Sequence, residues 1–415
     1  MQDLINKYFY ILFLVTYIFG LLFYNEIHLL TDFQWTDEVC ALTLLTGYLY
    51  IVFTSKEWYV NKAFLVTLFI FLFYIAYSFK IGSNSPKAII MDVIIQIKPY
   101  LVFFCVYQLK PYLDKNRKVL LNQISLVVWF IILVPIGVLG LINERYIWDI
   151  VEHPTSYAST IIATSLIYLF TSDYTLKNRL VFIGLLAIGL ISGRAKFYGF
   201  FVMAGAIVLY FDNIDKIKLN LKNVSMALVL VAVTLFVAKD KIEMYFVQGF
   251  TQDVEMDYVA RFALYGTSFS IFADYFPFGS GFASFATHAS GVYYSDIYAL
   301  YGIDSVWGLS KSYTSFITDT YYPSLAQFGV VGVVLFMLFW VYVVIKGMSI
   351  HAGQSLLYFS LALIIVCYFL IENIADSTFT GNRGLFMMLL LGYILSNLSH
   401  EKEELVETTE VTEKA

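Results

Sequence analysis

Long apolar runs alternate with short polar stretches along most of this chain, and one polar stretch is much longer than the others. The runs are long enough, or nearly so, to cross about 30 Å of hydrocarbon as helices. A chain inside lipid must satisfy its backbone hydrogen bonds internally, so the runs predict membrane-spanning helices. About twelve spans are expected, near Tyr8–Tyr24, Val39–Thr54, Ala63–Phe79, Ala88–Leu109, Val119–Ile142, Ser156–Phe170, Leu180–Ile191, Phe197–Phe211, Val224–Val237, Tyr322–Ile345, Gln354–Ile371 and Gly384–Leu398.

The polar stretches between the runs differ in charge. Lys110–Lys118, Lys177–Arg179 and Lys216–Lys222 are rich in Lys and Arg, whereas the stretches that alternate with them hold fewer basic residues. Because basic loops stay in the cytoplasm, this alternation predicts a topology with both termini cytoplasmic. The long segment Asp240–Thr320 then faces outward. We therefore expect an all-α polytopic protein, with residues 1–400 forming a single membrane domain.

Composition supports a membrane protein and limits its chemistry. The chain is 60% hydrophobic and only 14% charged, whereas soluble domains carry roughly 25% charged residues. The acidic tail Glu401–Ala415 supplies much of the net charge of −5, and we expect this cytoplasmic tail to be disordered. The three cysteines imply no disulfide framework, and the five histidines are scattered. No metal, cofactor or nucleic-acid partner is expected.

The long outward segment contains a predicted helix at Arg261–Phe276. Its aromatic residues follow spacings of three and four, which is the helical period. We expect an amphipathic helix that lies on the outer membrane face or on the bundle and packs through this stripe. Pro277 ends the helix, and the turn-rich sequence PFGSGF follows. The stripe would hold Arg261 in place and consists of Phe262, Tyr265, Phe269, Phe272 and Phe276.

Aromatic residues make up 19% of the chain, and many lie in or beside the outward segment. An interfacial aromatic belt explains most of them. The alternative is a sugar-binding groove, because rings offer flat apolar faces to a pyranose and tyrosine hydroxyls add hydrogen bonds. Both interpretations stay open for Tyr245, Tyr258, Tyr293, Tyr294, Tyr298, Tyr301, Trp307, Tyr313, Tyr321 and Tyr322.

Three arginines, Arg194, Arg261 and Arg383, are assigned to the outward face, where arginine is less expected. Arg194 lies in the short turn ISGRAKFYG, where a guanidinium is costly unless it is paired or hydrated. Guanidinium groups bind phosphate oxygens in pairs, so the three suggest a site for a lipid-linked diphosphate. The alternatives are snorkelling to lipid headgroups and ion pairing, for instance of Arg383 with Glu372 or Asp376.

Two residues are candidates for proton transfer. His288 has a suitable side chain near neutral pH, although a lone loop histidine is more often incidental. Asp319 either caps the helix of the next span or activates a sugar hydroxyl. Asp92 and Lys98 mark either the true boundary of the fourth run or a buried polar contact. Further candidates for binding substrate are Lys196, Tyr265, Asp274, Lys311, Tyr321 and Arg383, and Glu152, His153 and Tyr157 are outward residues that could line the same cavity.

Three segments occur in a recognisable order. A basic turn, SGRAKFYG, comes first, and an arginine-led helix with its turn follows as ARFALYGTSFSIFADYFPFGSGF. The third segment is a span with a polar start and paired glycines, TDTYYPSLAQFGVVGVVLF. This order resembles the O-antigen polymerase (Wzy-type) and O-antigen ligase superfamily of bacterial membrane proteins. The resemblance covers roughly Asn178–Ile345.

The resemblance implies a fold of the helical C type of glycosyltransferase (GT-C-like) and an inverting, metal-independent reaction. It implies that undecaprenyl-diphosphate-linked oligosaccharides of a surface polysaccharide are polymerised at the outer face of the bacterial cytoplasmic membrane. A chain-length regulator and a flippase would be partners in the same pathway. Carried over by motif, Arg194 and Arg261 would bind the diphosphate.

Two rival functions stay open. Ligases of this superfamily tend to carry a His-Asn pair where this chain has Thr318 and Asp319, which favours a polymerase and leaves Asp319 or His288 as the base. A transporter or flippase should show repeats, interrupted helices and ionisable groups at the midplane. Only Asp92 and Lys98 fit that pattern.

Overall fold

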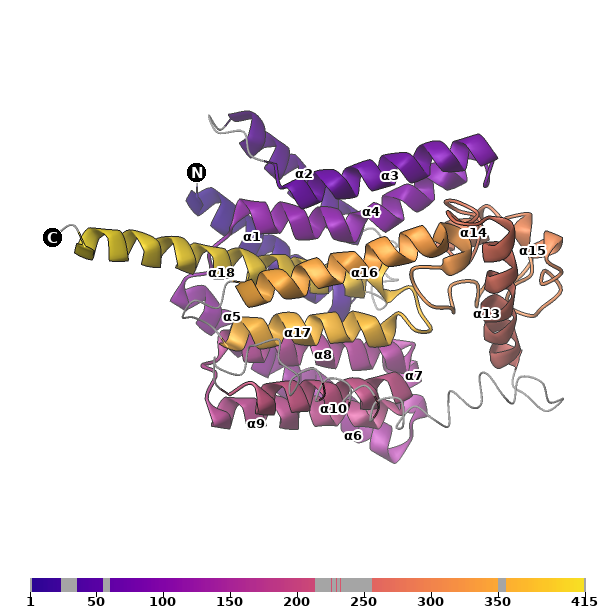
Figure 1. Cartoon of the computed structure of the whole chain (residues 1–415). Coiled ribbons are helices and arrows are strands. Elements are labelled where there is room, and N and C mark those ends of the chain that lie inside the picture. Colours follow the sequence, from indigo (N-terminus) through magenta and orange to yellow (C-terminus); the bar gives the residue numbers. More distant parts are fainter. Residues whose placement is uncertain are drawn as a thin grey trace.

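The computed structural model describes residues 2–23, 36–54, 60–212, 256–349 and 356–413, together with Ser225, Val229 and Ala232. Within these residues every regular element is a helix, apart from an isolated bridge between Ser310 and Tyr313. The long helices lie lengthwise beside one another in a bundle (Figure 1). Both termini lie at one end of it, and the opposite end carries α13 (Met256–Asp274), α14 (His288–Val292) and α15 (Ile297–Leu300) (Figure 1). The predicted all-α class is confirmed.

Six helical stretches in the described part of the chain are long and apolar enough to cross a membrane. Two shorter apolar helices, α10 (Ala195–Tyr210) and α17 (Leu356–Glu372), accompany them. The chain is therefore a helical membrane protein, while the count of twelve spans stays a prediction. The six stretches are α1 (Gln2–Tyr17) with η1 (Ile18–Leu22), α2 (Thr36–Thr54), α3 (Lys62–Ile81), α4 (Pro86–Leu109), α5 (Lys115–Val128) with η3 (Trp129–Leu133) and α6 (Val134–Ile142), and most of α16 (Leu325–Ser349).

The remaining apolar runs that the structure describes also coincide with helices. These are α8 (Pro154–Thr171), α9 (Leu176–Ala187) with η4 (Ile188–Ser192), and α18 (Asn382–Glu413). Parts of the prediction lie outside the described residues: the run Val224–Val237 apart from three residues, the basic stretch 216–222, residues 240–255, and the run ends Tyr24 and Gln354.

The backbone of residues 401–413 is helical, which differs from the disorder that composition predicts. These residues continue α18 without a break. The tail contains no glycine or proline and is rich in Glu and Lys, which are good helix formers, so nothing in its sequence stops the helix.

α4 and α18 pack closely because one glycine lets their backbones approach. A Cβ atom at Gly392 of α18 would lie 2.7 Å from the Phe103 carbonyl oxygen of α4. Phe103 and Tyr393 beside this contact are fully buried. Apolar side chains gain little by leaving lipid, so helices in membranes associate through close contacts of this kind.

We expect Gly392→Ala to destabilise the protein by about 1–3 kcal/mol, because the added methyl overlaps the Phe103 carbonyl. The matched control is Gly184→Ala in α9, where an added Cβ meets nothing within 4 Å. Alanine suits a helix better than glycine, so the control should be neutral or slightly stabilising. Thermal unfolding of the detergent-solubilised protein measures both, and equal midpoints would contradict the expected difference.

The turn PFGSGF docks on a break in α16. Gly329 interrupts that helix with a φ of +60°, a conformation that glycine adopts without strain. The N–H groups of Ser280 and Gly281 donate to the Ala326 and Gln327 carbonyls, both at 2.8 Å. A broken helix leaves carbonyls without internal partners, and here the outward segment supplies the donors. The contact fixes this segment to the end of the bundle.

α13 lies across the bundle end (Figure 1) but packs largely through a different face from the predicted one. Its buried residues are small or aliphatic, and they include Ala260, Leu264 and Ile271. Phe269 and Phe276 of the predicted aromatic stripe are 61% and 67% exposed. The small side chains allow the helix to approach its neighbours closely. Of the predicted stripe, Tyr265 still packs against Tyr321, whereas Phe269 and Phe276 stay exposed.

Candidate functional site

Oppositely charged side chains meet at the bundle end that carries α13. They come from junctions far apart in the sequence: the turn between α7 (Arg145–Val151) and α8, the start of α10, α13, the segment before α16, and the turn from α17 to α18 that includes η7 (Thr378–Thr380). Ion pairs and mutual electrostatic effects connect them. The charged cluster consists of His153, Arg194, Lys196, Arg261, Asp319, Glu372, Asp376 and Arg383.

Three ion pairs organise the charged cluster. The alternative that Arg383 pairs with an acid is confirmed, and the partner is Asp376 of the turn before α18. In each pair a Lys or Arg nitrogen lies within hydrogen-bond distance of a carboxylate oxygen. The distances are 2.6 Å for Arg261–Asp319, 2.8 Å for Arg383–Asp376 and 2.8 Å for Lys196–Glu372.

Arg194 lies against two rings rather than simply extending into solvent. Its guanidinium carbon is 5.6 Å from the centroid of the Trp148 ring, and its Nη2 is 3.2 Å from His153 Nε2. The His153 ring in turn meets Trp148 edge-on, with centroids 5.0 Å apart. The Thr155 N–H donates to His153 Nδ1 at 3.2 Å, at the start of α8. The tryptophan therefore holds Arg194 and His153 beside each other.

The cluster shifts the proton affinities of its members in different directions. Burial would raise the pKa of Asp376, but Arg383 and Lys196 outweigh it, and this pKa lies below its usual value. Burial raises the pKa of Asp319, and Arg261 only partly opposes this. Partial burial and the nearby guanidinium groups lower the pKa of His153 to about 4. At neutral pH the imidazole is therefore uncharged.

Asp319 does not cap the next helix, contrary to one of the two interpretations made from the sequence. α16 begins at Leu325, and the Ser324 hydroxyl is the side chain that accepts a helix N–H there, from Gln327 at 3.4 Å. Asp319 instead bonds Arg261 of α13. The carboxylate is thus a member of the charged cluster, which leaves a chemical role open to it.

Tyr265 and Tyr321 lie beside the cluster. The Tyr265 hydroxyl donates to the Ile374 carbonyl in the turn after α17, and the two tyrosine rings are 5.3 Å apart. The Tyr321 hydroxyl and the buried Ser268 hydroxyl share a hydrogen bond of 3.1 Å. These contacts connect α13 to the segment that carries Asp319 and to the turn that carries Asp376.

The structure places three other predicted site residues away from the charged cluster. Asp274 accepts a hydrogen bond of 2.6 Å from the Tyr301 hydroxyl. Lys311 is exposed in the turn bounded by Ser310 and Tyr313. His288 begins α14, which packs on α4. The charged groups that influence the pKa of its imidazole are Lys98 and Glu38. The outward segment has an apolar core of its own, so its residues are spread around that core.

Polar residues inside the bundle form a second connected group. α4 runs without interruption through Asp92, which is fully buried, so the polar-contact interpretation of this residue is confirmed. Its carboxylate accepts from the Ala283 N–H at 2.6 Å, from Gln96 at 3.1 Å and from Gln327 at 2.5 Å. The Tyr322 hydroxyl donates to the other end of the Gln96 amide at 3.2 Å. The group fastens α4, α16 and the outward segment together.

Lys98 is also buried and bonds two acids of α2 that the sequence analysis did not single out. Its ammonium nitrogen lies 2.5 Å from Asp37 and 2.5 Å from Glu38. The acids stand at the start of α2. Because a charge inside a membrane span needs a partner, Lys98 within an apolar run could have been used to predict nearby acids.

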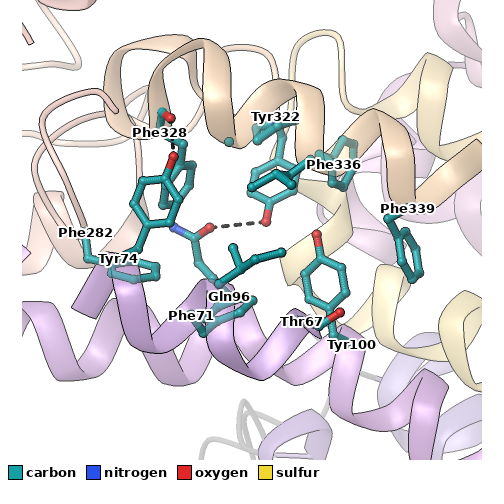
Figure 2. Close-up of a pocket in the computed structure, with 14 residues that line it drawn as sticks. Thr67, Phe71, Tyr74, Gln96, Tyr100, Phe282, Tyr322, Phe328, Phe336 and Phe339 are labelled. Carbon is teal, nitrogen blue, oxygen red and sulfur yellow. Dashed lines mark hydrogen bonds between the residues drawn. The ribbon is translucent and has the colours of Figure 1, made fainter. Parts of the chain in front are cut away.

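A pocket of about 80 Å³ lies between α3, α4 and α16 (Figure 2). Aromatic rings form most of its wall, and the Gln96 amide and the Tyr322 hydroxyl face each other within it (Figure 2). Of the residues that the sequence offered for a site, the pocket is lined by Tyr322, one of the aromatic residues for which a sugar-binding groove stayed open. Tyr322 links the pocket to the cluster region, because its N–H donates to the Asn373 carbonyl at 2.8 Å.

The arrangement can hold an anion and accept a proton. Among the residues named for the charged cluster, the Lys and Arg side chains outnumber the carboxylates. Over the residues that the structure describes, no group of His, Cys, Asp and Glu is placed to hold a metal ion. Sequence reasoning missed Trp148 and ranked His153 low. The one signal for them was their position in a short outward stretch between two apolar runs.

Comparison with protein-family models and with curated proteins finds no match to this chain. The resemblance to O-antigen polymerases and ligases stays a prediction.

Proposed function

We propose that this protein is a polymerase of a bacterial surface polysaccharide, an O-antigen, capsule or exopolysaccharide. In this proposal it is an inverting, metal-independent glycosyltransferase that moves the growing glycan from undecaprenyl diphosphate onto the next lipid-linked repeat unit. The observation that carries the proposal is one connected set of charges: Lys196 and Asp376 act electrostatically both on His153, which lies beside Arg194, and on Asp319, which pairs with Arg261. An exposed bundle end with several guanidinium groups suits a lipid-linked diphosphate.

The reaction needs two kinds of group, and the cluster holds both. A hydroxyl of the acceptor sugar attacks the anomeric carbon of the donor, and the bond from that carbon to the diphosphate oxygen breaks. The electron pair leaves with the diphosphate, where Arg194 and Arg261 stabilise the developing charge. The hydroxyl proton passes to the Asp319 carboxylate, whose raised pKa makes it a better base than an ordinary aspartate.

The Arg261–Asp319 pair couples donor binding to base strength. In the structure Arg261 bonds Asp319 at 2.6 Å. A diphosphate that draws this guanidinium to itself removes part of the positive charge that holds the carboxylate ionised. The proton affinity of Asp319 then rises when the donor is in place. The base is therefore strengthened only when a donor is bound.

The arrangement of the bundle ends supports the proposed direction of the chain in the membrane. We place the protein in the bacterial cytoplasmic membrane with both termini cytoplasmic and the charged cluster outward. The basic turn after α4 lies near the N-terminus, since the Gln2 side chain donates to the Lys110 carbonyl at 2.9 Å. This turn and the termini therefore share the bundle end opposite α13 (Figure 1). A flippase and a chain-length regulator of the same pathway are the proposed partners.

A ligase that passes finished glycan to a lipid or protein acceptor is the second candidate. It would use the same diphosphate site. The argument for a polymerase over a ligase is that Thr318 and Asp319 stand where ligases of the superfamily tend to carry a His-Asn pair. A flippase is less well supported, because the charged cluster lies at one end of the bundle. The buried charges of α4 have partners that fasten helices together.

Mass analysis of lipid-linked glycans in a deletion strain tests the proposal. We expect single repeat units to accumulate on the outer face, because the cell still makes and exports lipid-linked repeat units while their polymerisation stops. The wild-type gene should restore polymer, and a form carrying Arg194→Ala and Arg261→Ala should not. Arg145→Ala is the matched control, since this arginine is exposed in α7 and lies outside the cluster.

Other products would assign a different function. Long polymer that stays on its lipid carrier would indicate a ligase, and intermediates facing the cytoplasm would indicate a flippase. Normal glycan length and yield with the double substitution would contradict the proposed roles of both arginines.

A further inference from the structure

Most of the polar side chains in the pocket between α3, α4 and α16 donate to acceptors within the protein. The Thr67 and Tyr74 hydroxyls donate to backbone carbonyls at 2.9 Å and 2.7 Å. The Tyr322 hydroxyl donates to the Gln96 side chain at 3.2 Å. The Gln96 amide nitrogen donates in turn to one side chain of α4 at 3.1 Å and to one of α16 at 3.2 Å. These donors are therefore satisfied inside the protein.

Tyr100 differs from the other polar residues of the pocket. Its side chain is only 8% exposed, and its hydroxyl points into the pocket (Figure 2). No group in the described part of the chain accepts a hydrogen bond from this hydroxyl. A hydroxyl carries one donor, and a polar group removed from water needs a partner. The pocket therefore presents a donor that suits an acceptor oxygen on a ligand.

The mouth of the pocket opens on the side of the bundle. The lining residues Ile70 of α3 and Leu335 of α16 are half-buried, whereas Tyr100 lies buried behind them. Beside these positions both helices expose large apolar side chains, such as Phe69 and Leu338. Both helices are long and apolar enough to cross a membrane. In a membrane, acyl chains cover such surfaces, so a ligand enters this pocket from the lipid.

The pocket lies at the level where other spans end. The Tyr322 N–H donates at 2.8 Å to the carbonyl of Asn373, which directly follows α17. Lys98, two residues before Tyr100, pairs with the acids at the start of α2. Charged groups and tyrosines gather at the border between hydrocarbon and headgroups. The ester carbonyls of glycerophospholipids lie at this border, and each places an acceptor oxygen at the end of an acyl chain.

We propose that the pocket binds a glycerophospholipid, with an ester carbonyl accepting a hydrogen bond from the Tyr100 hydroxyl and the acyl chain leaving between α3 and α16. A volume of about 80 Å³ has room for roughly three groups the size of a water molecule. That suits an ester group and is too small for a sugar ring. A polyprenyl chain carries no carbonyl and would leave Tyr100 without an acceptor. The inference goes beyond the proposed function and does not depend on it.

Bound lipid would stabilise a wall that also supports the charged cluster. Phe379 of η7 packs on the Tyr100 and Tyr322 rings, with centroids 5.1 Å and 5.3 Å apart. The same turn carries Asp376 before η7 and leads to Arg383 after it. A ligand that binds only the folded form raises the unfolding temperature. Thermal unfolding at increasing lipid concentration therefore measures the affinity.

Ester and ether lipids isolate the contribution of the carbonyl. The probes are phosphatidylglycerol with two ester-linked oleoyl chains and its analogue with two ether-linked oleyl chains. Each is titrated into the delipidated, detergent-solubilised full-length protein. We expect the ester lipid to bind about threefold to tenfold more tightly, which is the usual effect of one neutral hydrogen bond. Equal affinities for the two lipids would overturn the proposal.

Tyr100→Phe removes the donor and breaks no hydrogen bond within the described protein. Without lipid this variant should be at least as stable as the wild type. It should bind both lipids with the affinity that the wild type has for the ether lipid. Tyr50→Phe is the matched control, because Tyr50 is exposed on α2 outside the pocket, and it should keep the preference for the ester. A Tyr100→Phe variant that also keeps this preference would contradict the proposed contact.

A second pair of variants locates the lipid in the pocket. Leu335→Trp narrows the mouth and should weaken both lipids several-fold, whereas Leu338→Trp, on the same helix but outside the lining, should not. Unchanged affinities with Leu335→Trp would place the lipid elsewhere and refute the proposal. Farnesyl phosphate has no carbonyl and should compete only weakly. Strong competition by farnesyl phosphate, equal in the wild type and in Tyr100→Phe, would assign the pocket to an isoprenoid chain instead.

Discussion

Arg261→Ala is expected to lower the rate of polymer formation on the order of a hundredfold, the typical loss when one stabilising donor is removed from a developing oxyanion. The substitution has two expected consequences. In the proposed reaction the leaving diphosphate loses a guanidinium, and in the structure the Asp319 carboxylate loses its partner at 2.6 Å. Consumption of lipid-linked repeat units by the purified protein measures the rate, and gel electrophoresis of the product measures chain length.

A double-substitution cycle separates these two consequences. Arg261→Ala alone leaves a carboxylate without its partner, which should lower stability as well as activity. Adding Asp319→Asn removes that charge, so thermal stability should recover. The rate should stay low, since neither the leaving-group contact nor the base is restored. Recovery of polymer formation in the double variant would show that the pair is only structural.

Asp92→Leu is expected to destabilise the fold on the order of 3 kcal/mol or more, because several donors lose their acceptor at once. The carboxylate is fully buried and accepts from the Ala283 N–H and from the side chains of Gln96 and Gln327. A leucine offers none of these a partner. Thermal unfolding in detergent and the yield of folded protein measure the effect.

Asp114→Asn is the matched control for this substitution. Asp114 caps α5 by accepting the Arg117 N–H at 2.8 Å, and asparagine caps helices about as well as aspartate. It should leave the unfolding midpoint nearly unchanged. A leucine variant at position 92 as stable as this control would show that the buried network contributes little.

The positions of most helices could be predicted from the sequence because apolar runs are a strong signal in a membrane protein. The runs around α3, α4 and α10 agree with the helices within a few residues. Short helices such as α7 and α14 were missed, because a few turns of mixed polarity have no clear period. The contact of α13 with the bundle was only partly predicted, since Tyr265 of the aromatic stripe takes part in it and Phe269 does not. Bulky rings gave the pattern, whereas the small residues Ala260 and Ser268 gave the close fit.

The site was only partly predictable for a related reason. Arg194, Arg261 and Arg383 were found because an outward arginine is unexpected next to an apolar run. Their partners depend on which turns meet at the bundle end, and a single sequence carries no signal for that. His288 illustrates the limit: its chemistry suited a base, yet it begins α14 beside α4, where Lys98 is its charged neighbour.

The charged cluster draws on turns that lie between α7 and the start of α18. A ribosome delivers these pieces in order, and Asp376 and Arg383 emerge almost last. Until the final helix has entered the lipid, Lys196 and Arg261 have no complete set of neighbours. Under the proposed function we therefore expect a nascent or truncated chain to be inert, so that carrier lipids would meet a complete site only after the last helix has inserted.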